Sequence, residues 1–176
     1  SWHSVLGGVW MIGAVATYRI YRRRRGDFIR IAGTARSLEE PEMLALAETW
    51  SNRLGIRREV RLVSSTESVA PFTFGIFRPV VFIPRAVIDD PKCLEPVLAH
   101  EMAHVARFDA LWLGLQHILQ AVYFFHPLVW ISGARLNQER ERLCDATVVS
   151  AGRLTAHDYV GGLLNVLRLD LQGVEA

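Results

Sequence analysis

The chain has 176 residues, a length that suits one domain plus a membrane segment. Hydrophobic residues make up 51% of it and the mean hydropathy is +0.18, which favours a membrane-associated protein over a freely diffusing one. The two cysteines, Cys93 and Cys144, are far apart and form no CxxC motif, so a disulfide framework is excluded. The net charge of +2 is small but unevenly distributed.

The N-terminal segment combines an apolar run with a cluster of arginines. Residues 1–18 contain no Lys, Arg, Asp or Glu, and then Arg19 and Arg22–Arg25 follow together. This order predicts a transmembrane helix over 1–21, the end of a longer membrane region, and a basic juxtamembrane linker over 22–36. A nucleic-acid patch or a solvated linker face are alternatives, but the adjacent apolar sequence favours contact with anionic lipid head groups. The positive-inside rule then places the rest of the chain in the cytoplasm.

The next segments predict one helix and several short strands. A helix with an N-cap at Ser37 is expected to run to about Leu54 and to end at Gly55. Residues 59–63 form a predicted strand, and two extended segments follow, 70–77 and 79–83, joined near Arg78-Pro79. An edge strand in the 72–83 region would bind an extended peptide by strand addition, although a core hairpin explains the pattern equally well.

The most informative motif is HEMAH, His100 to His104, on a helix predicted over 91–108. Two imidazoles four residues apart differ by only about 40° around a helix, so both can reach one ion. Glu101 projects to one side, where it can accept a proton from water at the metal. This is the HExxH arrangement of zinc metalloproteases. Pro96 fits this helix only if it lies in the first turn.

A pair of hydrogen-bonded core histidines would be the alternative to a metal site. The helix is apolar around His100 and His104, and burying unpartnered imidazoles there is costly. Further along the chain, Glu141 and Asp145 lie four residues apart on a helix that begins at Pro127 and continues toward Gly152. Glu141 can supply the third zinc ligand, and Asp145 can accept the second N–H of a ligating histidine. Cys144 is interpreted as a small buried residue.

Between these helices lies an uncharged segment, predicted as a helix over 110–125. It is either a core helix or one that lies in the membrane interface, and the second is favoured. Asp109 is expected to cap it, with orientation of a ligand histidine as the alternative. His117 is interpreted as a core or interfacial histidine. His126 is a candidate helix cap, and a catalytic role in binding an oxyanion is the less favoured alternative. A last helix is expected over 155–169.

The segments HEMAHVARFDALW, FFHPLVW and ERLCDA resemble the integral-membrane zinc metallopeptidases of the BlaR/MecR type, which are signal-transducing gluzincins. GIFRPVVFIP, residues 75–84, is similar to the strand that precedes the metal helix in that family. The resemblance covers about residues 37–152. It implies that His100, His104 and Glu141 bind Zn²⁺, that Glu101 is the general base and that Asp145 supports a ligand.

The resemblance further implies an α+β fold, a gluzincin-like zinc metallopeptidase domain over 37–170 that is mostly helical with a small mixed sheet, attached to the N-terminal transmembrane helix. It implies an endopeptidase at the bacterial inner membrane that faces the cytoplasm and cleaves a transcriptional repressor or itself, in a pathway such as antibiotic resistance. Membrane lipids are expected partners, nucleic acid is not, and self-association into a homo-oligomer stays open. The alternatives are an HtpX-type or CAAX-type membrane protease and a non-catalytic membrane sensor with a vestigial zinc site.

Overall fold

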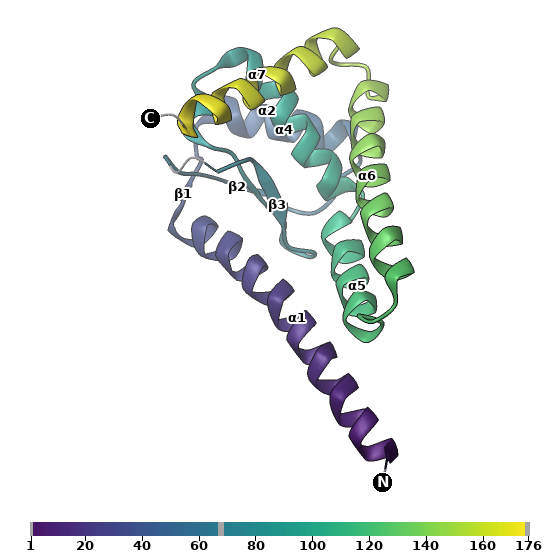
Figure 1. Cartoon of the computed structure of the whole chain (residues 1–176). Helices are drawn as coiled ribbons and strands as arrows, with labels where there is room; N and C mark the ends of the chain where they lie inside the picture. Colours follow the sequence, from purple (N-terminus) through teal and green to yellow (C-terminus); the bar gives the residue numbers. More distant parts are fainter. Residues whose placement is uncertain (1, 67–68, 175–176) are drawn as a thin grey trace.

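The computed structural model describes residues 2–66 and 69–174, and Figure 1 shows a helical domain with a small sheet and a long N-terminal helix. This is the mostly helical α+β fold with a small mixed sheet that the sequence predicts. The elements are α1 (Trp2–Thr34), β1 (Arg36–Ser37), α2 (Pro41–Arg53), β2 (Arg61–Ser64), β3 (Phe72–Phe74), β4 (Val80–Phe82), α3 (Arg85–Ile88), α4 (Pro91–Ala106), α5 (Asp109–Val122), α6 (Pro127–Ser150) and α7 (Ala156–Val174).

The four strands form one sheet in the order β1-β2-β4-β3. The central strands β2 and β4 are parallel, and each outer strand is antiparallel to its neighbour. The β3–β4 connection turns at Gly75, whose φ of +91° and close approach to the Arg78 carbonyl both require a residue without Cβ. In the strand order of the described residues, β3 lies at one edge of the sheet. Thr73, in the centre of β3, is directed toward α4, where its hydroxyl contacts Glu101.

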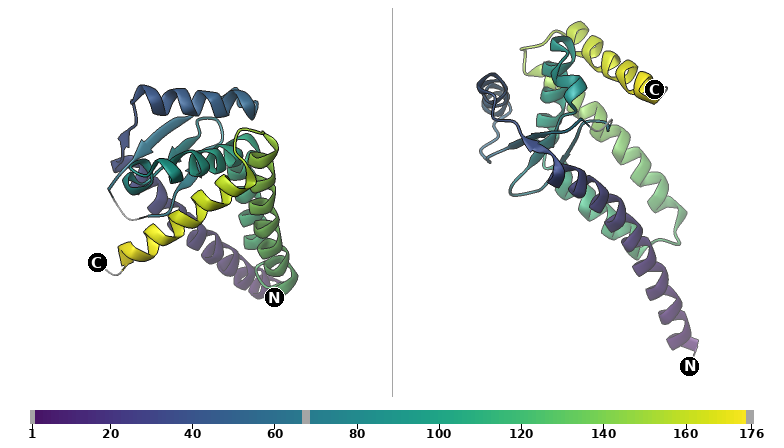
Figure 2. Two further views of the ribbon diagram at one scale, coloured as in Figure 1. Left: turned by 90° about the horizontal axis from the view of Figure 1, so that it is seen from above. Right: turned by 90° about the vertical axis from the view of Figure 1, so that its left-hand side faces the viewer.

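The core is built around α4, the helix that carries HEMAH. Most of its residues are buried, including Leu98, Ala99, Met102 and Ala103, which have no exposed surface. Helices α2, α3, α6 and α7 and the sheet surround it, as the views of Figure 2 show. Because α4 is covered on nearly every side, its sequence is apolar around the motif. Asp90 is the N-cap that precedes α4, and its carboxylate accepts a hydrogen bond from the Lys92 amide at 2.9 Å.

Two N-terminal predictions differ from the structure. Ser37 is not a helix cap but a residue of β1, where it pairs with Val63. Helix α2 starts only at Pro41, a residue suited to a first helical position because it has no N–H to leave unpaired. Residues 22–36, predicted as a linker, continue the helix α1 without a break as far as Thr34.

Helix α1 differs from the expected transmembrane segment in its composition. Its uncharged part ends at Tyr18, and serine, glycine and histidine residues interrupt the apolar run. Across residues 2–66 and 69–174, no helix combines the length and the apolar character needed to cross a membrane. The predicted transmembrane helix over 1–21 is therefore not found in the described chain.

Pro96 lies inside α4 rather than in its first turn, which corrects the sequence interpretation. A proline there cannot donate the usual hydrogen bond to the carbonyl four residues earlier, which belongs to Lys92. Helix α7 packs against this point with Gly162. A Cβ at position 162 would lie 2.4 Å from Pro96 Cγ and 2.7 Å from the Lys92 carbonyl oxygen. The absence of a side chain at Gly162 therefore sets how closely α7 approaches α4.

We expect Gly162→Ala to lower the free energy of unfolding by about 1–3 kcal/mol, because the added methyl group forces α7 away from α4. The matched control is Gly161→Ala, where a Cβ meets nothing within 4 Å and the better helix propensity of alanine should add up to about 1 kcal/mol. Urea unfolding of both variants measures the difference. Equal stability of the two would contradict the close packing of α7.

Candidate metal centre

The two motif histidines face each other from successive turns of α4. Their Nε2 atoms lie 3.2 Å apart, and the rings are nearly perpendicular at 82°. Both side chains are 16% exposed, so they are reachable from solvent although the helix is otherwise buried. The predicted convergence of His100 and His104 on one point is therefore present in the structure.

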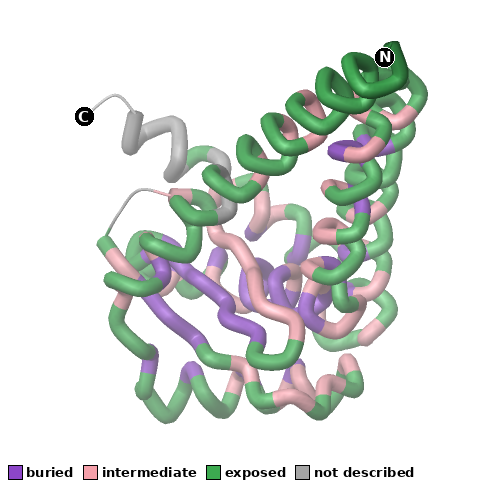
Figure 3. The backbone as a smooth tube through the Cα atoms, turned by 90° about the horizontal axis from the view of Figure 1, so that it is seen from below, coloured by how far each residue is buried: buried purple, intermediate pink, exposed green. Residues whose placement is uncertain are grey.

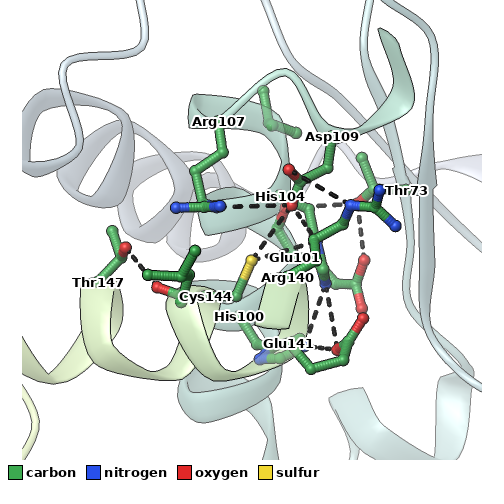
Figure 4. A network of polar contacts seen from close by, with 12 residues as sticks. Thr73, His100, Glu101, His104, Arg107, Asp109, Arg140, Glu141, Cys144 and Thr147 are labelled. Carbon is green, nitrogen blue, oxygen red and sulfur yellow. Dashed lines mark hydrogen bonds and ion pairs between the residues drawn. The ribbon is translucent and has the colours of Figure 1, made fainter. Parts of the chain in front are cut away.

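Glu141 of α6 joins the pair. Its Oε2 lies 3.3 Å from His100 Nε2 and 3.7 Å from His104 Nε2. These contacts hold the pKa of the Glu141 carboxyl well below its usual range. The close-up in Figure 4 shows the carboxylate directed at the histidines from the neighbouring helix. The structure thus brings Glu141 to the two histidines, although it lies 41 positions after His100 in the sequence.

The second nitrogen of His100 is held by two groups. Its Nδ1 lies 2.7 Å from the Tyr159 hydroxyl and 3.2 Å from Asp145 Oδ1, and the hydroxyl itself donates to Asp145 Oδ1 at 2.7 Å. Because the hydroxyl proton is used on Asp145, the Tyr159 oxygen is free to accept the N–H of His100 Nδ1. This arrangement leaves the lone pair of Nε2 directed toward Glu141. The structure places Asp145 within contact distance of His100, whereas Tyr159 was not among the residues singled out from the sequence.

Asp109 holds the second nitrogen of His104. Its Oδ2 lies 2.8 Å from His104 Nδ1, and its side chain is only 8% exposed. The expected helix cap is wrong, because the N-cap position of α5 is occupied by Phe108, in a left-handed conformation with φ +58°. Arg107 and Arg140 lie 3.6 and 3.8 Å from the Asp109 carboxylate. Two cationic side chains therefore stabilise a nearly buried anion.

The electrostatics of the cluster favour a positive charge. Burial opposes protonation of His104, but its contacts with Asp109, Cys144 and Glu141 outweigh that effect and raise its pKa to about 12. Burial also disfavours the Asp109 carboxylate, but the His104 hydrogen bond keeps its pKa below the usual value. Carboxylates that stabilise a proton on an imidazole also stabilise a cation between the imidazoles.

Glu101 lies beside the cluster in a different setting. Its side chain is almost fully buried, and this burial raises its pKa. The Thr73 hydroxyl of β3 donates to Glu101 Oε2 at 2.7 Å, which fixes the carboxylate orientation. A raised pKa is the property expected of a carboxylate that takes up and releases a proton.

These side chains line one cleft of about 320 Å³ between α4, α5, α6 and β3. A divalent zinc ion prefers nitrogen and carboxylate ligands and, in catalytic sites, three protein ligands with one open position. The two imidazole Nε2 atoms and Glu141 Oε2 fit this requirement, and the Glu141 side chain is 57% exposed on the open side. The donor set therefore suits zinc.

His104, Asp109 and Cys144 form a second possible group of metal ligands. This group uses His104 Nδ1, and the Cys144 sulfur lies 3.2 Å from that atom. Both Cys144 and Asp109 are buried, and burial raises the pKa of the Cys144 thiol, so its neutral form is favoured. The open group with Glu141 is the better metal site, and Cys144 is the small buried residue that the sequence indicates.

His126 does not join the cluster. It precedes Pro127 at the N-cap of α6, while Glu141 lies about 20 Å further along the same helix. The His126 side chain is exposed and makes no capping hydrogen bond. The structure therefore offers no contact through which His126 would bind an oxyanion in this cleft.

Tyr159→Phe tests the support of His100, because it removes one hydroxyl and keeps the buried ring. We expect zinc affinity to fall about 10- to 100-fold, the usual loss when a group that orients a metal ligand is removed. Competition with a chromophoric chelator measures this affinity. Tyr123→Phe, at a half-exposed tyrosine on the neighbouring α5–α6 connection, is the control. Unchanged affinity in Tyr159→Phe would show that the hydroxyl does not orient His100.

Comparison with known proteins supports the resemblance read from the sequence. The family model described as BlaR1 peptidase M56 matches residues 1–173. The regulatory protein BlaR1 of Bacillus licheniformis is 29% identical over 150 residues, covering 83% of this chain and 24% of that protein. The methicillin resistance mecR1 protein of Staphylococcus aureus (strain Mu50) is 22% identical over 157 residues, covering 86% and 26%. This chain spans about a quarter of these relatives, and it belongs to the BlaR1 peptidase M56 family.

Proposed function

We propose that the chain is the peptidase part of a zinc endopeptidase that cleaves a protein substrate in signal transduction. The observation that carries the proposal is the convergence of His100 Nε2, His104 Nε2 and Glu141 Oε2 in a solvent-reached cleft, with Glu101 beside them. A structural zinc site closes with four protein ligands and has no use for an adjacent base. The open side and the retained Glu101 therefore favour hydrolysis over a non-catalytic sensor.

Bound zinc supplies a Lewis acid that polarises a peptide carbonyl and makes water more acidic. Glu101 accepts a proton from the attacking water and passes it to the leaving amine. Thr73 holds the Glu101 carboxylate in place during both transfers. Asp109, Asp145 and Tyr159 keep the two imidazoles in the orientation that directs Nε2 into the cleft.

The edge strand β3 is the proposed binding surface for an extended substrate. It borders the cleft through Phe72 and Thr73 and pairs with β4 on its other side. A peptide added to the free edge would form main-chain hydrogen bonds next to Glu101. This proposal favours a substrate cleaved in an extended or unfolded segment.

The resemblance to BlaR/MecR proteins supports the wider setting of the proposal. We propose that the substrate is a cytosolic transcriptional repressor or the protein itself, and that the peptidase faces the cytoplasm at the bacterial inner membrane. Because the HExxH and ExxxD residues are shared with HtpX-type and CAAX-type proteases, a quality-control or processing role is the second candidate. The family match favours the signalling role.

Incubation of the purified chain with a complex mixture of bacterial peptides, followed by mass spectrometry of the new termini, tests the activity. We expect cleavage that requires zinc, stops with a chelator and returns when zinc is added back. A chain that contains one equivalent of zinc but produces no new termini from peptides or from itself would contradict the peptidase proposal. The non-catalytic sensor would then be the remaining alternative.

A further inference from the structure

The turn between α4 and α5 contains a residue in a strained backbone conformation. Among residues 2–66 and 69–174, Phe108 is the one non-glycine residue with a positive φ, at +58°. A side chain disfavours this left-handed region, so such a residue persists only where surrounding contacts hold it. Phe108 directly precedes Asp109, whose Oδ2 lies 2.8 Å from His104 Nδ1. The contacts that hold the turn therefore also orient one of the proposed zinc ligands.

Arg58 makes such contacts from a distant part of the chain. It lies in the connection between α2 and β2, 47 positions before Val105. Its Nη2 donates to the Val105 carbonyl in the last turn of α4, and its Nη1 donates to the Ile76 carbonyl between β3 and β4. Its Cζ lies 3.7 Å from the centre of the Phe108 ring. One side chain thus links the end of α4, the strained residue and the connection that follows β3.

The chemistry of these contacts suits an arginine. Carbonyls in the last turn of a helix lack helical N–H partners and carry partial negative charge. The Val105 carbonyl accepts from the Phe108 amide at 3.1 Å, and the Arg58 guanidinium adds a second, charged donor to the same oxygen. A planar guanidinium donates within its plane and stacks through its face, so the two carbonyls and the ring do not compete for it. The Phe108 ring is 42% exposed, so core packing covers only part of it.

The connection that carries Arg58 lies at the border of the core. Residues 54–60 are all exposed or partly buried, whereas α4 is largely buried, and Figure 3 shows such connections in green and pink around the purple interior. Partial burial lowers the pKa of Arg58, but a guanidinium stays charged at neutral pH. A charge that is partly removed from water needs partners. Those of Arg58 converge on the α4–α5 turn and on the connection after β3.

We propose that Arg58 is a positioning residue of the metal centre, which holds the left-handed turn at Phe108 so that Asp109 keeps its hydrogen bond to His104. Arg58 contacts neither the metal ligands nor the cleft and acts through the backbone of the turn. The inference rests on the zinc site proposed above, because it assigns Arg58 a role in orienting one ligand of that site.

Arg58→Met tests the role, because methionine keeps an unbranched side chain and removes the charge and the donors. We expect zinc affinity to fall about tenfold, at the lower end of the loss seen when a group that orients a ligand is removed. Competition with a chromophoric chelator measures the affinity. Arg57→Met, at the exposed arginine next to Arg58, is the matched control and should bind zinc as the wild type does. If Arg58→Met does not fold, Arg58→Lys takes its place with the same expected loss, since an ammonium cannot make all three contacts at once.

A second substitution distinguishes positioning of the ligand from general support of the fold. Glycine adopts the left-handed conformation without strain, so in Phe108→Gly the turn no longer depends on Arg58. We expect Phe108→Gly alone to bind zinc within about threefold of the wild type. In the Phe108→Gly background, Arg58→Met should change the affinity less than about twofold, compared with tenfold when Phe108 is present. In NMR spectra of the metal-free protein, the His104 Nδ1 proton should exchange faster in Arg58→Met and slowly again in the double variant.

Each contrary outcome contradicts a different part of the inference. A folded Arg58→Met protein that binds zinc as tightly as the wild type would overturn the positioning role, even if its stability were lower. Equal losses of affinity with phenylalanine and with glycine at position 108 would overturn the route through the turn. A wild-type chain that binds no zinc would overturn the metal site and the inference together. Peptide cleavage by the wild type tests the peptidase proposal separately.

Discussion

Zinc-loaded Glu101→Gln protein is expected to cleave peptides about 10²- to 10⁴-fold more slowly than the wild type. Glutamine keeps the size of the side chain and can still accept the Thr73 hydrogen bond, but it cannot take a proton from water. The rate constant for cleavage of an identified peptide at saturating zinc measures the loss. Zinc content should stay at one equivalent, because Glu101 is not among the three converging ligands.

Glu95→Gln is the matched control for Glu101→Gln. Glu95 lies on the same helix, pairs with Arg153 and does not line the cleft, so its loss should leave the rate unchanged. The two variants should also differ in stability without metal. Because burial raises the pKa of Glu101, ionisation destabilises the folded wild type as the pH rises above the usual glutamate range, and Glu101→Gln should remove this dependence. A Glu101→Gln protein that cleaves at the wild-type rate would exclude Glu101 as the base.

Glu141→Gln is expected to weaken zinc binding by at least about 100-fold, because it removes the anionic ligand that lies near both imidazoles. At a fixed zinc concentration well above both dissociation constants, a 100-fold loss of affinity removes about 2.7 kcal/mol of zinc-dependent stabilisation. For a chain of this length that corresponds to a fall of roughly 5–10 °C in Tm. Thermal unfolding with and without zinc measures it.

The matched control is Glu139→Gln, two residues earlier on α6. Glu139 is exposed and pairs with Arg142 at 2.7 Å, an interaction that contributes little at a surface. Its Tm in zinc should equal that of the wild type. If Glu141→Gln kept the full zinc-dependent increase in Tm, the ion would be held by other residues, and the group of His104, Asp109 and Cys144 would be the first alternative.

Reasoning from the sequence pointed to His100, His104 and Glu141 as candidate ligands and to Asp145 as a supporting residue, but it favoured a helix cap for Asp109 and did not single out Tyr159. HEMAH fixes its own geometry, because helix periodicity alone places His100 and His104 on one face. Asp109 follows the end of α4, where a carboxylate next to a new helix is more typical of a cap; the left-handed turn at Phe108 and the contact with His104 are seen only in the structure. Tyr159 lies on an apolar helix face, and no local pattern distinguishes a packing tyrosine from one that contacts a histidine.

In the fold, too, the elements with a local sequence pattern were predicted, whereas those that depend on long-range contacts were not. Helices α4, α6 and α7 agree with their predicted ranges to within a few residues, apart from the longer C-terminal end of α7. Ser37 was misplaced because a serine before two glutamates is typical of a helix start, whereas pairing with Val63 is a long-range contact. The arginines of α1 continue a helix because arginine is a good helix former, although their charge ends the apolar run.

One unbroken helix, α6, starts at the α5–α6 connection and carries Glu141 about 21 Å further along. An α-helix of this length moves nearly as a rigid rod, so a tilt of about 5° around its first turn displaces Glu141 by roughly 2 Å. Metal coordination tolerates deviations of only about 0.2 Å. In the proposed metal site, the angle between α4 and α6 would therefore control whether Glu141 reaches an ion between the imidazoles, and a force on the distant end of α6 would act on the proposed site.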